Sequence, residues 1–219
     1  MGLFREKRWL NDPFAAARAE NKILQLRAAT VVGLAVPDTV VTSDPDAVRA
    51  LAARCPEGII VKLLAVSPIY GQVIYTNRVT PAHLQQIESV RKSPSIFQRL
   101  ILKAHELRIT IVGERIFAAK ILSQEDEATA LDWRRKPLLN DYAVRMEAVQ
   151  LPEEIKERIF VLMRALELRF GCIDMIVTPT GDHVFLEVNP NGQWYFVQLK
   201  TGEAIAEAIA ELLTTDIKS

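Results

Sequence analysis

The chain is poor in cysteine, with only Cys55 and Cys172 among its 219 residues. These two lie far apart in the sequence, which makes a disulfide framework unlikely and predicts a reducing, cytoplasmic compartment. No apolar run reaches the roughly 18 residues that a membrane-spanning helix needs. The charged start of the chain also lacks the apolar core of a signal peptide. We therefore expect a cytoplasmic protein that does not enter a membrane.

Net charge is absent as well, because 27 basic side chains balance 27 acidic ones. This balance argues against general attraction to nucleic acid or to a membrane surface. Histidine is scarce, and His83, His105 and His183 show no spacing typical of a metal site or a catalytic triad. The three histidines are most simply surface residues, and no arrangement of side chains indicates a protein nucleophile.

What the chain does contain is a large apolar fraction, 49% of its residues. This is enough for one large domain or two small lobes. Helices and strands are expected to alternate, but a predicted hairpin across Gly113-Glu114 breaks any regular parallel pattern, so the predicted fold class is α+β. Capping and periodicity predict helices from Asn21 to Val32, after Ser43-Asp44-Pro45, after Thr80-Pro81, after Pro152 and from Thr201. Strands are expected at 39–42, 59–64, 73–75, 95–101, 106–112, 115–122, around Asp174 and around Glu187. The first 20 or so residues are expected to be irregular, with a turn at Asn11-Asp12-Pro13.

Acidic side chains inside two apolar strands carry the most information about function. Asp174 lies in one such run, and Glu187 and Asn189 end the next. Strand side chains alternate, so Glu187 and Asn189 share a face, and Asp174 joins them if the two strands pair. Oxygen ligands of this kind suit Mg²⁺. The alternative is that nearby Arg or Lys residues pair with the carboxylates, because an unpaired buried carboxylate is costly.

Four basic residues are candidates for anion binding. Lys62 ends an apolar strand and could reach a phosphate, or its long side chain could simply extend to water. Arg108 shares a strand face with Glu106 and could hold a phosphate or carboxylate, although the same pattern fits a solvent-exposed face. Arg134 and Arg135 could bind phosphate or an acidic substrate, or be ordinary loop charges. Local sequence does not separate these alternatives.

Taken in order, these segments resemble the ATP-grasp superfamily of carboxylate–amine ligases, and within it the microviridin-type maturases of ribosomal peptides. The resemblance runs from about Asn11 to the C-terminus, and the segments that carry it are Asn21-Lys22, Gly33-Leu34-Ala35-Val36-Pro37, Ile60-Val61-Lys62, Glu106-Leu107-Arg108-Ile109, Asp132-Trp133-Arg134 and the two acidic strands. It implies two α+β lobes with ATP between them. The expected division is an irregular segment at 1–20, a small lobe at 21–101 and a large lobe at 102–219.

The resemblance also implies roles for individual residues. Lys22 and Lys62 would contact the nucleotide, and Arg108 and Arg134 would lie near its phosphates or the substrate carboxylate. The strand that includes Gln98, Arg99, Leu100 and Ile101 would form the hinge that meets the adenine, and Asp174, Glu187 and Asn189 would bind Mg²⁺. The expected activity is ADP-forming ligation of a peptide or small carboxylate through an acylphosphate. The rival hypothesis is a nucleotide-binding regulator or partner subunit without turnover.

The sequence departs from the family pattern at three places. Relatives carry a further N-terminal domain, which leads us to expect a homodimer or a separate partner chain that supplies that domain. The phosphate-covering loop, Ala65 to Gln72, contains one glycine, Gly71. Arg99 stands in the hinge where an acidic residue is expected.

Overall fold

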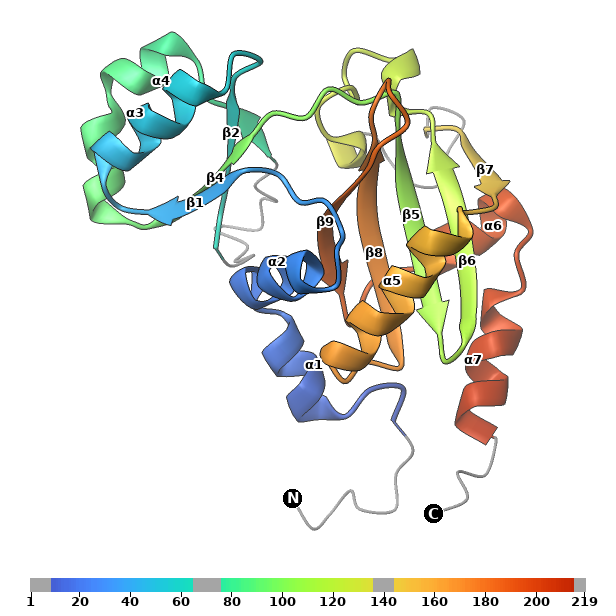
Figure 1. Ribbon diagram of the computed structural model, residues 1–219. Coiled ribbons are helices and arrows are strands. Elements are labelled where there is room, and N and C mark those ends of the chain that lie inside the picture. The colour runs from blue at the N-terminus through green and yellow to red at the C-terminus, as the bar shows by residue number, and fades with distance from the viewer. Residues whose placement is uncertain (1–8, 65–75, 136–143, 215–219) are drawn as a thin grey trace.

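Two antiparallel sheets organise the computed structural model, which describes residues 9–64, 76–135 and 144–214. The first sheet has the strand order β1-β4-β2-β3 and the second β7-β6-β5-β8-β9. The strands are β1 (Thr39–Thr42), β2 (Ile59–Lys62), β3 (Asn77–Arg78), β4 (Ser95–Arg99), β5 (His105–Val112), β6 (Arg115–Ile121), β7 (Met146–Val149), β8 (Phe170–Val177) and β9 (His183–Asn189). Figure 1 shows the two sheets side by side, joined by the chain between β4 and β5. The predicted α+β class is confirmed.

Helices cover both faces of the five-stranded sheet. The helices of the chain are α1 (Pro13–Ala19), α2 (Lys22–Val31), α3 (Pro45–Arg54), α4 (Pro81–Gln85), α5 (Glu153–Ala165), α6 (Tyr195–Thr201) and α7 (Ile205–Thr214), with short 3₁₀ turns at Ile87–Lys92, Ser123–Glu125 and Trp133–Arg135. On one face α5 and α2 bury Ile109, Ile173 and Phe185, and on the other α6 and α7 bury Ile121 and Cys172. A fully buried side chain of this size contributes about 2 kcal/mol.

The four-stranded sheet has its own core. Helix α3 packs against β1 and β4, and its Val48 and Leu51 are fully buried with Ile59 and Phe97 from the strands. In Figure 1, α3 and α4 lie on the outer side of this sheet, away from the five-stranded sheet. The inner side of the four-stranded sheet therefore faces the five-stranded sheet. Polar side chains from both sheets meet in the space between them.

Capping signals determine where several helices start. Asp44 caps α3 through the N–H of Asp46, and Thr80 and His83 cap each other's backbone at the start of α4. In both helices a proline occupies the first turn. Backbone N–H groups in the first turn have no acceptor within the helix, so the N–H that proline lacks costs no hydrogen bond there. These starts, and that of α2 at the Asn21 cap, are confirmed as the sequence predicts.

The expectation of an irregular segment up to about residue 20 is wrong, because Pro13–Ala19 form the helix α1. Asp12 caps this helix by accepting the N–H groups of Phe14 and Ala15, and Pro13 occupies its first turn. Asn11 is buried, and its amide bonds the backbone of Phe170 twice and that of Arg169 and Pro190 once each. The segment read as a turn is therefore a helix cap anchored to the large sheet.

The prediction that the last helix starts at Thr201 is also wrong. Thr201 ends α6, and Gly202 follows in the left-handed conformation at φ +74°. Glycine suits this position because it carries no Cβ. The final helix, α7, begins only at Ile205. The short edge strand β7 and helix α6 were not predicted, and the expected phosphate-covering loop and the strand expected at 73–75 lie outside the described residues.

Candidate active site between the two sheets

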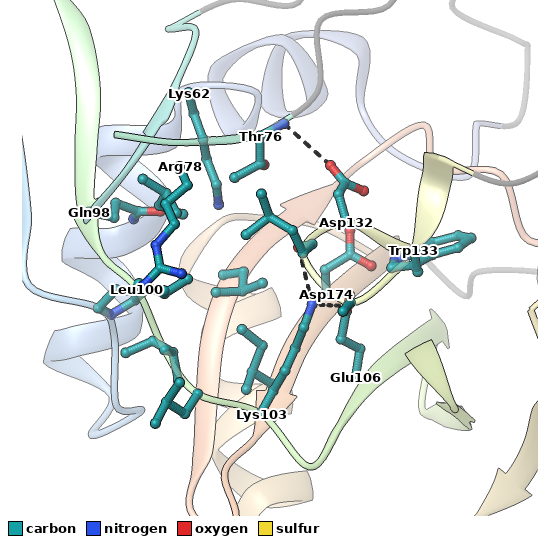
Figure 2. Close-up of a pocket in the computed structure, with 18 of the residues that line it drawn as sticks. Lys62, Thr76, Arg78, Gln98, Leu100, Lys103, Glu106, Asp132, Trp133 and Asp174 are labelled. Carbon is teal, nitrogen blue, oxygen red and sulfur yellow. Dashed lines mark hydrogen bonds and ion pairs between the residues drawn. The ribbon is translucent and has the colours of Figure 1, made fainter. Parts of the chain in front are cut away.

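A cavity of about 260 Å³ lies between the inner side of the four-stranded sheet and one end of the five-stranded sheet. It is lined by residues of β2 and β4, the connecting segment 100–103, the segment 130–134 and the strands β8 and β9. Figure 2 shows Lys62 pointing into this space from one sheet, with Asp132, Asp174 and Glu106 on the other side. Most residues that the sequence singled out for chemistry therefore meet at one place.

Asp174 and Glu187 lie directly opposite each other in the β8–β9 register. A single register shift follows between Asp174 and Met175, and regular pairing then resumes from Met175, which lies opposite Phe185. Alternation along β9 puts Glu187 on the face opposite to the buried Val188. Two carboxylates in register at a cavity wall are a suitable pair of ligands for a hard cation.

Arg108 on β5 holds Asp174 in place. Its Nη1 donates to Oδ1 and Oδ2 of Asp174 at 2.9 and 3.0 Å, and its Nη2 donates to the carbonyl of Gln193 at 2.8 Å. Burial lowers the pKa of Arg108, but Asp174 outweighs this and the net pKa is raised. Arg108 and Glu106 are both buried, so the interpretation of this strand face as solvent-exposed is wrong.

Lys22 at the start of α2 forms an ion pair with Glu187. Nη1 of Arg134 lies 4.0 Å from the other carboxylate oxygen. Burial by itself would raise the pKa of Glu187, but the charges of Lys22 and Lys62 outweigh burial and hold the pKa at about 2. Glu187 is therefore ionised at any physiological pH, as a metal-binding carboxylate must be.

Lys62, at the end of β2, lies close enough to Glu187, Lys22 and Arg134 for their charges to shift its pKa. Desolvation lowers the pKa of its ammonium, the charges of Glu187 and Asp174 oppose this, and those of Lys22 and Arg134 lower it further. A desolvated lysine gains from a bound anion. The alternative that Lys62 merely extends to water is not favoured by its place at the cavity wall.

Arg134 is oriented by the buried carboxylate of Asp132. Its Nε and Nη2 donate to the two oxygens of Asp132 at 2.9 and 2.8 Å, and the N–H of Thr76 also points to this carboxylate at 3.4 Å. Burial would raise the pKa of Asp132, but the bonds from Arg134 lower it below the ordinary value. The adjacent Arg135 donates to the carbonyl of Thr76 at 3.0 Å, so this short segment connects the two sheets.

The end of β4 and the segment that follows it form part of the cavity wall. Gln98, Arg99, Leu100 and Ile101 all line the cavity. The N–H of Leu100 bonds the carbonyl of Gly58 at 2.9 Å. The guanidinium of Arg99, at the position where an acidic residue was expected, forms an ion pair with Glu57 at 3.0 Å.

The sequence interpretation missed the buried ion pair of Lys103 and Glu106, which also lines the cavity (Figure 2). The ammonium donates further to the carbonyl of Leu131 at 3.1 Å and so ties the connecting segment to the Arg134 segment. Burial raises the pKa of Glu106, and Lys103 opposes this rise. A lysine three residues before a strand carboxylate was the available signal, but its meaning depends on the path of residues 123–131.

Three predicted site residues do not line the cavity. Lys22 and Arg108 reach it only through their carboxylate partners, and Asn189 is exposed, its Oδ1 accepting the N–H of Asn191 at 3.0 Å. Among the described residues no cluster of three or more His, Cys, Asp or Glu side chains could hold a metal. The donor set still fits Mg²⁺ if Asn189 or substrate oxygens complete it, because Mg²⁺ is usually bound by one or two carboxylates with phosphates and water. Within the described ranges no helix is long and apolar enough to cross a membrane.

Comparisons with known proteins find structures similar to this chain. No family model matches the chain. The macrocyclase MdnC of Microcystis aeruginosa, solved with its precursor peptide MdnA, is 36% identical, with a TM-score of 0.84 over 94% of this chain and 64% of its own. An ATP-grasp ligase of Chryseobacterium gregarium, solved with ADP and a leader and core peptide, is 31% identical, with a TM-score of 0.85 over 93% of this chain and 62% of its own.

A curated relative from Histophilus somni (strain 2336), named "Probable alpha-L-glutamate ligase", is 26% identical over 200 residues, which are 90% of this chain and 64% of the relative. The chain thus spans somewhat less than two thirds of the length of these relatives. The matches extend over 90% to 94% of this chain. On this similarity of sequence and structure, the chain has the ATP-grasp fold of these ligases.

Proposed function

We propose that the chain is an ATP-dependent ligase that activates a carboxylate as an acylphosphate and joins it to an amine or a hydroxyl group. The observation that carries the proposal is the meeting of Lys62, Arg134, Asp174 and Glu187 around one cavity beside the connecting strand. Cations and ionised carboxylates in one site suit the binding of a nucleotide triphosphate together with its metal. The similarity to ATP-grasp ligases supports the same reading.

The reaction would proceed in two displacements. An oxygen of the substrate carboxylate attacks the γ-phosphorus of ATP, the bond to the bridging oxygen breaks, and ADP leaves. An amine or hydroxyl then attacks the acyl carbon, its proton is released, and the carbon–oxygen bond to phosphate breaks. The ammonium of Lys62 and the guanidinium of Arg134 would balance the negative charge on the transferring group. Neither step needs a protein nucleophile, in keeping with the lack of such an arrangement in the sequence.

Asp174 and Glu187, with Asn189, would hold a divalent cation at the phosphates. When bound, this cation supplies charge neutralisation of the phosphoryl group. Arg108 and Lys22 stand behind the two carboxylates and keep them placed. The residues Gln98, Arg99, Leu100 and Ile101 would meet the adenine, and the side chains of Arg108 and Lys22 would act on substrate or nucleotide only through the carboxylates they bind.

A peptide is the favoured source of the carboxylate, with a small acid as the alternative. Support comes from the two solved ligases, which were determined with peptides bound. A homodimer or a separate partner chain is a further part of the proposal. The free thiols of Cys55 and Cys172 support a reducing, cytoplasmic setting.

The test combines Mg²⁺ and ATP with panels of acid-bearing peptides, small acids and amines, and measures ADP release and the mass of any condensation product. We expect ADP, phosphate and a product lighter than the summed reactants by one water. Glu187→Gln serves as the inactive control, and Glu114→Gln, on the exposed hairpin turn, serves as the unaffected one. Tight ATP binding with no turnover on any panel would instead favour the nucleotide-binding partner.

A further inference from the structure

Gln98 is a buried amide at the wall of the cavity. Only 2% of its surface is exposed, and it lies on β4 just before the connecting segment. Its Nε2 donates to the hydroxyl of Thr39 on the neighbouring strand β1 at 3.0 Å. That hydroxyl donates in turn to the carbonyl of Pro37 at 2.7 Å. The three groups form a short chain of hydrogen bonds, here called the relay, from the backbone to the cavity wall.

The relay fixes which end of the amide faces the cavity. A threonine hydroxyl has one hydrogen, and here Pro37 receives it. Toward Gln98 the hydroxyl can only accept, so the NH₂ end of the amide must face Thr39. The carbonyl oxygen Oε1 must then point the other way. The orientation of the amide therefore follows from the chemistry of its neighbours.

Oε1 of Gln98 lacks a hydrogen-bond donor in the part of the chain that the structure describes. It is buried and has no hydrogen-bond partner among the described residues. A buried acceptor without a donor is costly, so it favours a ligand that brings one. Figure 2 shows Gln98 with Leu100, Arg78 and Lys62 around the same cavity. The nucleotide bases differ in what they could offer, because adenine carries an amino donor where guanine carries a carbonyl acceptor.

We propose that Thr39 is a positioning residue that selects adenine over guanine nucleotides by locking the amide of Gln98 with its acceptor toward the base. The inference rests on the nucleotide site of the proposed function. Thr39 itself does not line the cavity and acts only through Gln98. Without the hydroxyl, the amide can turn and offer its NH₂ end, which suits the guanine carbonyl as well as the carbonyl end suits adenine.

The test measures the affinities of the full chain for Mg·ATP and Mg·GTP by titration calorimetry and compares their ratio. Thr39→Val keeps the shape and the β-branched character of the strand residue but removes the hydroxyl. We expect it to lower the preference for ATP by about tenfold, since the locked acceptor no longer discriminates. Thr39→Ser keeps the hydroxyl and should keep the preference. Thr42→Val makes the same change three residues along β1 and should leave the ratio as in the wild type.

Gln98→Leu provides a second variant, because it removes the acceptor altogether and should abolish most of the base preference. Circular dichroism and melting temperature confirm that each variant is folded. Unchanged ATP preference in folded Thr39→Val and Gln98→Leu would overturn the inference while leaving the ligase proposal intact. If the wild type binds neither nucleotide, the proposed function itself fails, and with it the role of Thr39.

Discussion

Asp174 and Glu187 face each other in register across β8 and β9, yet each is bound by a cation from a different part of the chain. Arg108 reaches Asp174 from the next strand, and Lys22 reaches Glu187 from a helix 165 residues earlier in the sequence. The two carboxylates are thus held in place before any ligand arrives. The ion pairs that were the alternative are present, and they leave both carboxylates at the cavity wall, where the metal site stays a prediction.

Replacing Glu187 by Gln should remove the Mg²⁺-dependent part of nucleotide binding. The amide lacks the charge that a hard cation requires. We expect the melting temperature of the wild type to rise with Mg·ATP by mass action and that of Glu187→Gln to rise much less. Glu114→Gln is the matched control. Equal shifts in all three proteins would remove Glu187 from the site.

Replacing Arg108 by Met should destabilise the fold strongly. The largely buried carboxylate of Asp174 would lose the guanidinium that pairs with it, and we expect the free energy of unfolding to fall by about 3 kcal/mol. Urea unfolding measures the change. Arg91→Met breaks the exposed pair with Glu88 and should stay within about 1 kcal/mol of the wild type. A loss for Arg108→Met no greater than that control would contradict a buried, stabilising pair.

The contribution of Asp132 to the free energy of unfolding should decrease under acid conditions. Its pKa is lowered in the folded state from the ordinary value of 3.8, so its contribution is fully present above that value and is lost as the pH falls through the folded-state pKa. The unfolding free energy of Asp132→Asn should therefore lie well below that of the wild type at pH 7, and the gap should narrow under acid conditions. A constant gap from pH 7 to pH 3 would speak against this pairing.

Gly192→Ala should disturb the support of Arg108. An added Cβ would lie 2.4 Å from the Cβ of Cys172 and 3.1 Å from Nη2 of Arg108, which bonds the carbonyl of Gln193. Neighbouring backbone must then move, at a loss of about 1–3 kcal/mol. Thermal unfolding and the Mg·ATP affinity are the two readouts. Wild-type values for both would mean that the loop after β9 adjusts freely.

Part of this site was predictable from local pattern, because charges inside apolar strands are conspicuous. Asp174, Glu187 and Lys62 could be found this way, and alternation placed them on definite strand faces. The pair of Lys103 and Glu106 could not, since its third partner, the carbonyl of Leu131, comes from a segment without regular structure. Asn189 satisfied the same pattern as its neighbours, but the structure turns it toward the backbone of Asn191.

The amino-acid sequence alone determined the helix caps at Asn21, Asp44 and Thr80, the β5–β6 hairpin and the presence of two acidic strands, because each depends on residues only a few positions apart. The tertiary structure decided which charges meet. Lys22 with Glu187, Thr39 with Gln98 and Asp132 with the backbone of Thr76 are contacts between distant segments. Such pairs depend on the path of the chain and on the register of the strands, neither of which short-range periodicity encodes.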